Sequence, residues 1–233
     1  DHTSNTIYAA FKIKKTEIDY LKNARVIIWT TTPWTIPANR ALAYSDKIKY
    51  SLVKIGKDNE DFKNENIVIA SQLVNKVVEE CNLKDFQVLK EFEGKILQNT
   101  ICSHPFESFG YGYDVPMLEG DFVTLEQGTG IVHAAPSHGP DDFNLCLKHG
   151  IKASNTINDG GLYSEEIPFF SGTHIFKADI QVIEKLSENK SLLGKGKLQH
   201  SFPHSWRSKA PLVYRATSQW FISMEKKDLR KKA

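Results

Sequence analysis

Several signatures of common protein classes are missing from this chain of 233 residues. No apolar run approaches the length of a membrane span, and the first residues carry no signal-peptide pattern. The three cysteines are widely spaced and form no C-x-x-C pair, which argues against a disulfide framework and a structural zinc site. We therefore expect no metal or other cofactor, no membrane partner, and a reducing compartment, the cytoplasm or an organellar matrix.

Charge is small in sum but unevenly distributed. The formal net charge is +2, yet residues 190–233 contain eleven Lys or Arg against two carboxylates, so the preceding residues are net acidic. Such a basic end is typical of a segment that lies near a polyanion. A solvated surface, or a junction with a further domain, would explain the same asymmetry.

Short strand-like runs dominate the first two thirds of the chain, and helical patterns are fewer. β-branched and aromatic residues bounded by Gly, Asn, Asp or Pro predict strands at 7–13, 25–31, 50–55, 66–70, 86–92, 122–125 and 130–134. Helical spacing of apolar residues predicts helices at 71–80, with a serine cap, and at 177–189. Many short strands with few helices indicate an α+β fold, a closed or nearly closed β-barrel with peripheral helices.

A threonine-rich segment reads W-T-T-T-P-W-T from Trp29 to Thr35. If its first part is a strand, Thr30 and Thr32 point to one face and Thr31 to the other. Pro33 favours an extended Thr32, and the following turn frees backbone amides. Hydroxyls and free amides suit phosphate, ribose or ester oxygens. Alternatively, threonine is here only a good strand residue.

A second unusual segment, residues 128–142, reads G-T-G-I-V-H-A-A-P-S-H-G-P-D-D. His133 sits between apolar neighbours, where a lone histidine is more often a core residue than a functional one. His138 and Ser137 lie between the strand and the carboxylates and could support either. The two polar segments together suggest one pocket lined by threonines, a histidine and an aspartate.

The end of this second segment predicts a helix over 140–149. Proline suits its first position and Gly150 its stop, with Phe143, Cys146 and Leu147 on the buried face. Asp142 falls in the first turn, where the helix macrodipole favours negative charge, so we expect it to be ionised at neutral pH.

Two longer stretches carry a family resemblance. W-T-T-T-P-W-T-I-P-A-N-R and G-T-G-I-V-H-A-A-P-S-H-G-P-D-D-F resemble the editing insertion of isoleucyl-tRNA synthetase. The later F-P-H-S-W-R-S-K-A-P-L-V-Y-R-A-T-S-Q-W-F is similar to the stretch by which that insertion returns to the synthetase body. The activation signatures H-I-G-H and K-M-S-K-S do not occur. The resemblance thus implies an editing domain over 1–200 and a basic return segment over 201–233.

The resemblance implies the β-barrel-like editing fold of class I synthetases and a hydrolase that removes valine from isoleucine tRNA. It implies that Asp142 holds the amino-acid ammonium and that His133 lines the side-chain pocket. Further site residues are then expected to be catalytic (Thr30, Thr31, Thr32) or substrate-binding (Trp34, Asn39, His138).

The expected partners are the 3′ end of isoleucine tRNA carrying valine, valyl-adenylate and the rest of the synthetase. Two other functions stay open. One is a non-catalytic tRNA-binding module that uses the basic end. The other is the editing domain of a valyl or leucyl enzyme, although those carry T-T-R-P where this chain has T-T-T-P.

Overall fold

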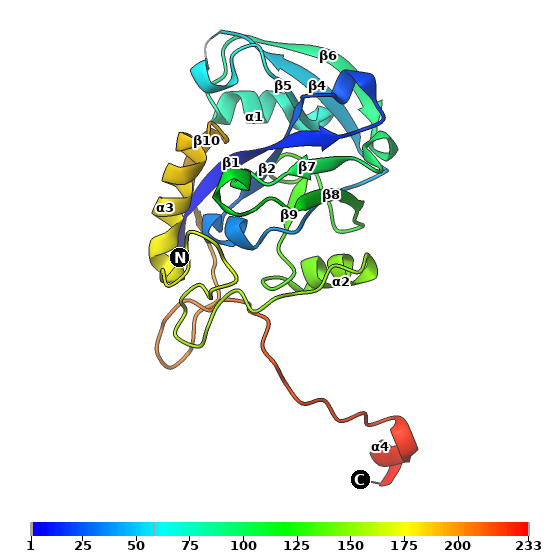
Figure 1. Ribbon diagram of the computed structural model, residues 1–233, viewed down its shortest axis with the longest axis vertical. Helices are drawn as coiled ribbons and strands as arrows, with labels where there is room; N and C mark the ends of the chain where they lie inside the picture. The colour runs from blue at the N-terminus through cyan, green and yellow to red at the C-terminus, as the bar shows by residue number, and fades with distance from the viewer. Residues whose placement is uncertain (1, 58, 233) are drawn as a thin grey trace.

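A long N-terminal strand organises the fold (Figure 1). The computed structural model describes residues 2–57 and 59–232, and in it β1 (His2–Lys15) pairs antiparallel with three other strands. These partners are β2 (Arg25–Thr30), β7 (Ile101–Ser103) and β10 (Leu192–His200). Most of β1 is buried, as a strand between several others should be.

The sheet runs in the order β6-β4-β5-β2-β1-β7-β8-β3-β9, with β10 paired to β1 off this path. Its remaining strands are β3 (Ala41–Tyr44), β4 (Lys49–Ile55), β5 (Asn66–Ala70), β6 (Phe86–Glu93), β8 (Asp114–Glu119) and β9 (Val132–Ala134). β9 packs beside β2, so six strands curl into a barrel-like unit, and β4, β5 and β6 extend it on one side.

Among the described residues, three helices lie at the periphery of this sheet, and a short fourth one lies apart from it near the C-terminus (Figure 1). They are α1 (Val74–Glu80), α2 (Pro140–Lys148), α3 (Ile175–Glu188) and the short α4 (Leu229–Lys232). Single 3-10 turns occur at Asp19–Leu21, Pro33–Ala38, Glu60–Phe62, Ser71–Leu73, Gly94–Leu97, Glu107–Phe109 and Lys226–Asp228. None of the helices in the described ranges combines the length and apolar character that crossing a bilayer demands.

The chain beyond β10 leaves the sheet. It passes below the barrel in loops and then extends away from it to α4 (Figure 1). Large apolar side chains of this stretch are exposed, among them Trp206, Trp220 and Phe221. Its course agrees with a division of the chain near residue 200, which itself stays a prediction.

The α+β, barrel-like architecture predicted from the sequence is confirmed. The strand predicted at 122–125 is wrong, because this stretch forms a turn closed by the Val123 amide on the Gly120 carbonyl. The serine cap predicted for α1 is also wrong, since a 3-10 turn precedes the helix and its first residues have no side-chain cap.

The buried face predicted for α2 needs correction as well. Leu145 and Cys146 are buried, whereas Phe143 and Leu147 are 40% and 56% exposed. The helix therefore contacts the barrel through a narrower stripe than an ordinary amphipathic helix.

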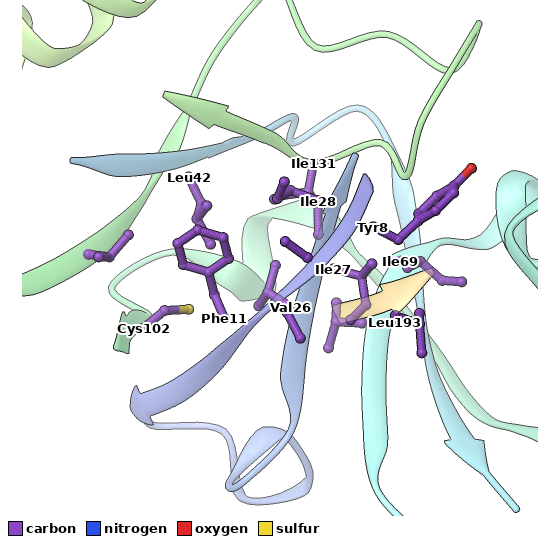
Figure 2. Close-up of a cluster of buried hydrophobic side chains, with 14 of the residues drawn as sticks. Tyr8, Phe11, Val26, Ile27, Ile28, Leu42, Ile69, Cys102, Ile131 and Leu193 are labelled. Carbon is purple, nitrogen blue, oxygen red and sulfur yellow. The ribbon is translucent and has the colours of Figure 1, made fainter. Parts of the chain in front are cut away.

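The core fills the barrel and the space under α3. Figure 2 shows Phe11, Leu42 and Cys102 in this cluster, contributed by β1, β3 and β7. Phe11 is fully buried, and its ring lies edge-on to the ring of His104 at 6.0 Å. Burial of a phenylalanine side chain contributes about 1.5–3 kcal/mol.

We predict that Phe11→Ala lowers the free energy of unfolding by about 3–5 kcal/mol, because it removes buried surface and leaves a cavity. Urea unfolding measures this loss. Val88→Ala is the control, since Val88 is 43% exposed and should change stability by about 0.5 kcal/mol or less. A Phe11→Ala protein as stable as the control would show that this strand does not anchor the core.

Candidate editing site

One short strand brings the two polar segments together. The threonine-rich segment ends β2 and continues through the 3-10 turn Pro33–Ala38 into β3. β3 then pairs antiparallel with β9, the strand of the second segment, with Ala41 opposite Ala134. The Arg40 amide also donates to the Ala134 carbonyl at 2.9 Å. Backbone pairing therefore places residues distant in sequence beside each other.

The threonine hydroxyls form a cluster at the end of β2. Thr30 Oγ1 lies 3.2 Å from Thr32 Oγ1 and accepts the Thr32 amide at 3.1 Å. Thr32 Oγ1 in turn lies 3.3 Å from Thr35 Oγ1. Thr30 and Thr32 share a side as predicted, but through a bend rather than strand alternation, because β2 ends at Thr30. Thr31 lies between them and is partly exposed.

A directed chain of hydrogen bonds runs from Asn39 to the threonine turn. Asn39 Nδ2 donates to His133 Nδ1 at 3.1 Å, so that ring nitrogen must accept. His133 Nε2 then carries the proton and donates to Thr35 Oγ1 at 2.7 Å. Thr35 Oγ1 donates onward to the Thr32 carbonyl at 2.8 Å. The chain fixes both the orientation and the tautomer of the imidazole.

His133 is consequently neutral. It is buried, and burial lowers its pKa to about 3, with the nearby His138 acting in the same direction. A protonated ring would also lose the bond from Asn39, because both nitrogens would then be donors. His133 can shape the site, but it is too weak a base to accept a proton at neutral pH.

Asp142 lies in the first turn of α2, next to the end of β9. Its Oδ2 accepts the Ala135 amide at 3.0 Å, so the first turn of α2 is fastened to the strand that carries His133. A Cβ at Gly139 would lie 3.2 Å from the Asp142 carboxyl carbon, so a larger residue there would crowd this side chain. Burial raises the pKa of Asp142 to about 6. The helix terminus does not lower it as expected, because desolvation outweighs the dipole, but the group still ionises at neutral pH.

Trp34 and His138 pack against each other next to the threonine turn. The Trp34 ring lies edge-on to His138 at 4.9 Å. His138 Nδ1 donates to the Tyr214 carbonyl at 2.9 Å, and its Nε2 accepts from the Thr156 hydroxyl at 2.8 Å. Burial lowers the pKa of His138 to about 4, so it too is neutral. The substrate-binding roles of Trp34 and His138 stay predictions.

A hollow of about 300 Å³ is lined in part by residues from both segments. Its wall includes Trp29 of the first segment and Gln127 and Gly128 at the edge of the second, together with Lys76 of α1. Of the residues described, neither Thr30 nor Asp142 is part of this wall. This hollow is therefore not the pocket of threonines, a histidine and an aspartate predicted from the sequence, and that pocket stays a prediction.

Sequence reasoning missed two residues that contact the site. Asp179 of α3 accepts the Trp34 amide at 2.9 Å, and the Tyr163 hydroxyl donates to the Trp34 carbonyl. Asp179 looks like an ordinary polar position of an amphipathic helix, and Tyr163 lies in a loop. Neither carries a local pattern that could have revealed the contact.

Comparison with known families shows to which family the chain belongs. A family model described as "Leucyl-tRNA synthetase, editing domain" matches residues 9–175, more than half of the chain. The chain belongs to this family of synthetase editing domains. The matched range contains both polar segments, the barrel strands β2 to β9 and α2.

The relatives found by sequence are isoleucine–tRNA ligases. The chain is 62% identical over 233 residues to that of Pelagibacter ubique and 43% identical over 241 residues to that of Gluconobacter oxydans. These matches cover 100% and 97% of this chain but only 26% and 25% of the two relatives. The editing-domain assignment made from the sequence is thereby confirmed.

Solved structures give the same fold. The crystal structure of GlLeuRS-CP1 superposes with a TM-score of 0.62 at 14% identity, covering 84% of this chain and all of that one. The editing domain of the P. knowlesi cytosolic leucyl-tRNA synthetase reaches a TM-score of 0.61 at 11% identity, covering 81% of this chain and 95% of that one. At such identities the likeness concerns the fold alone.

We predict that Asp142→Asn raises stability at pH 7. The folded carboxyl has a pKa of about 6 against an ordinary 3.8, so its contribution is favourable at low pH and is lost as pH rises through 6. The amide keeps the acceptor for Ala135 and carries no charge, so we expect a gain of about 1–2 kcal/mol after discounting for partial exposure.

Urea unfolding at pH 7 and pH 4.5 checks this prediction. The advantage of the variant should shrink at the lower pH, where the wild-type carboxyl is protonated in the folded state. A variant that is less stable than wild type at pH 7, or an advantage independent of pH, would contradict the burial of this carboxylate.

Proposed function

We propose that the chain hydrolyses the ester that joins valine to the 3′-terminal ribose of isoleucine tRNA. The observation that supports this most is the hydrogen-bond chain from Asn39 through His133 and Thr35 to Thr32, which joins both polar segments. It gathers the hydroxyls of Thr30, Thr32 and Thr35 beside β9, and the Ala135 amide just after that strand donates to Asp142. Membership of the editing-domain family and the similarity to isoleucine–tRNA ligases support the same conclusion.

The need for such a reaction follows from binding energetics. One methylene is worth only about 1–3 kcal/mol, a limit of which isoleucine and valine are the standard example. A site that accepts isoleucine therefore cannot strongly exclude valine. A second site that is too small for isoleucine can remove the error, because a steric clash rejects more strongly than a missing contact.

Asp142 is assigned to the substrate ammonium. It is ionised at neutral pH, partly desolvated and held by the Ala135 amide, and a bound ammonium would stabilise the carboxylate further. Its neighbour Asp141 is exposed and can supply the charge that favours the start of α2. The start of α2 therefore does not need the charge of Asp142.

The threonine turn is assigned to the terminal adenosine and the ester. Water attacks the ester carbonyl, the bond to the ribose oxygen breaks, and the proton lost by water passes to that leaving oxygen. Thr30, Thr31 and Thr32 hold the ribose and ester oxygens during this step. His133 takes no proton, because burial lowers its pKa to about 3 and its basic nitrogen, Nδ1, already accepts from Asn39.

Asn39 supports a substrate contact. Its Oδ1 is buried and lacks a hydrogen-bond partner within residues 2–57 and 59–232. A buried acceptor without a partner is costly unless a ligand supplies one. Asn39 is 0% exposed, so a ribose hydroxyl reaches this oxygen only if the turn above it opens, and the substrate-binding role of Asn39 stays a prediction. Lys76 and Trp29, in the wall of the hollow of about 300 Å³, suit the phosphate and base of a tRNA end.

The partners are then tRNA and the remainder of a synthetase. The basic residues 201–233 are assigned to the connection with that remainder, and valyl-adenylate is a second possible ester-like substrate. If the chain binds tRNA but hydrolyses no aminoacyl ester, it is a binding module. If it prefers a threonyl or leucyl ester, it edits for a related enzyme.

We predict that Asp142→Asn reduces the release of valine from valyl-tRNA by about a hundredfold or more, because the ammonium loses its charged partner. Radiolabelled deacylation measures the rate. Asp141→Asn is the matched control, one position away in the same helical turn, and should stay near wild type. Equal activity of the two variants would remove Asp142 from the mechanism.

We also predict that His133→Ala allows attack on isoleucyl-tRNA, which wild type rejects, because removal of the imidazole enlarges the side-chain pocket. His104→Ala is the control. His104 is equally buried, but it contacts the Ile36 carbonyl and the Phe106 amide instead of Thr35. Strict rejection of isoleucine by His133→Ala would show that this ring does not gauge size.

A further inference from the structure

Asp179 of α3 holds the threonine turn from outside the barrel. Its Oδ1 accepts the Trp34 amide at 2.9 Å. Trp34 is the second residue of the 3-10 turn Pro33–Ala38, and Pro33 before it has no amide hydrogen. The Trp34 amide is therefore the first donor of the turn. The first amides of a helical turn have no acceptor carbonyl within the turn, so this one needs an acceptor from elsewhere.

The same residue is held on its other side. The Tyr163 hydroxyl donates to the Trp34 carbonyl, so both backbone groups of Trp34 are bonded by side chains from distant segments. Two residues earlier, the Thr32 carbonyl accepts the Thr35 amide at 2.9 Å and the Thr35 hydroxyl at 2.8 Å. A shift of the Trp34 backbone would therefore move Thr32 and Thr35 with it.

The placement of Asp179 calls for an explanation beyond packing. The other residues by which α3 faces the barrel are apolar, among them Ile175, Ala178 and Val182. A carboxyl among them is desolvated, and burial raises the pKa of Asp179 to about 6. An apolar residue would avoid that cost, which the hydrogen bonds of Asp179 with the Trp34 amide and the Asn5 side chain offset.

We propose that Asp179 is a positioning residue for aminoacyl ester hydrolysis, which fixes the backbone at Trp34 and thereby the hydroxyl of Thr32. This inference rests on the proposed function. It assigns Asp179 no contact with the substrate. Its effect reaches the ester through the turn, so it changes the rate of the chemical step more than substrate binding.

The test compares Asp179→Ala and Asp179→Asn in the 233-residue chain. Alanine removes the acceptor, and we expect kcat for valyl-tRNA deacylation to fall about ten- to a hundredfold with KM within about twofold of wild type. Asparagine keeps an acceptor oxygen and should restore kcat to within about threefold. Glu184→Ala, at an exposed carboxylate of the same helix, is the control and should have no effect.

Amide hydrogen exchange provides a readout that needs no activity. Asp179→Ala should speed exchange at Trp34 and Thr35 while the β1 ladder keeps its protection. Unchanged exchange at these amides, or an unchanged kcat in Asp179→Ala, would overturn the positioning role. A kcat that asparagine does not restore would overturn it too.

The two proposals fail in different ways. If wild type hydrolyses no valyl ester, the proposed function fails, and exchange at Trp34 still decides whether Asp179 holds the turn. If wild type is active and the Asp179 variants match it, only the positioning role fails.

Discussion

The hydrogen bond between Thr35 and His133 joins the two halves of the site. It is buried, and each partner is fixed by a further bond, His133 by Asn39 and Thr35 by the Thr32 carbonyl. Breaking it would leave buried polar groups unpaired, which costs more than the bond itself contributes. The position of the threonine hydroxyls relative to β9 therefore depends on this contact.

The backbone makes that contact possible. A single 3-10 turn carries the chain from β2 into β3, and β3 pairs directly with β9. The imidazole thus lies on β9, and the hydroxyls lie at the end of β2 and in the turn that follows it. Anchoring to regular elements holds such groups more firmly than a free loop does.

Two partly buried carboxylates flank this arrangement and differ in their partners. Asp142 accepts the amide of Ala135 after β9, and Asp179 accepts the amide of Trp34 after β2. Burial raises the pKa of both to about 6. Each therefore lowers stability at neutral pH, and such a cost is typical of functional positions. Family resemblance directs attention to Asp142 alone, whereas the geometry adds Asp179.

Much of the fold was predictable, and the reason lies in local patterns. The strand at Asn66–Ala70 and the helix starting at Pro140 have clear boundaries in the sequence, and the structure confirms them. β3 was missed because Ala41–Tyr44 is buried on both faces and shows no alternation. β10 was missed because its glycines and lysines disfavour a strand, and only pairing with β1 stabilises it there.

The part of the site whose residues are clustered in the sequence was predictable, and the part that tertiary packing brings together was not. The threonine run and Asp142 stand out because several special residue types gather within a few positions. The role of Thr35 could have been inferred from its spacing to Thr32. Asp179 and Tyr163 reach the turn only through tertiary packing, so no pattern near Trp34 could indicate them.

The central claim is that both segments bind one aminoacyl-adenosine. A crystal structure of the chain with a non-hydrolysable amide analogue of valyl-adenosine tests it most directly. The account predicts that the ammonium lies within hydrogen-bond distance of the Asp142 carboxylate while the ribose contacts the turn at Thr30 to Thr32. An analogue that binds elsewhere, or that touches only one of the two segments, would contradict it.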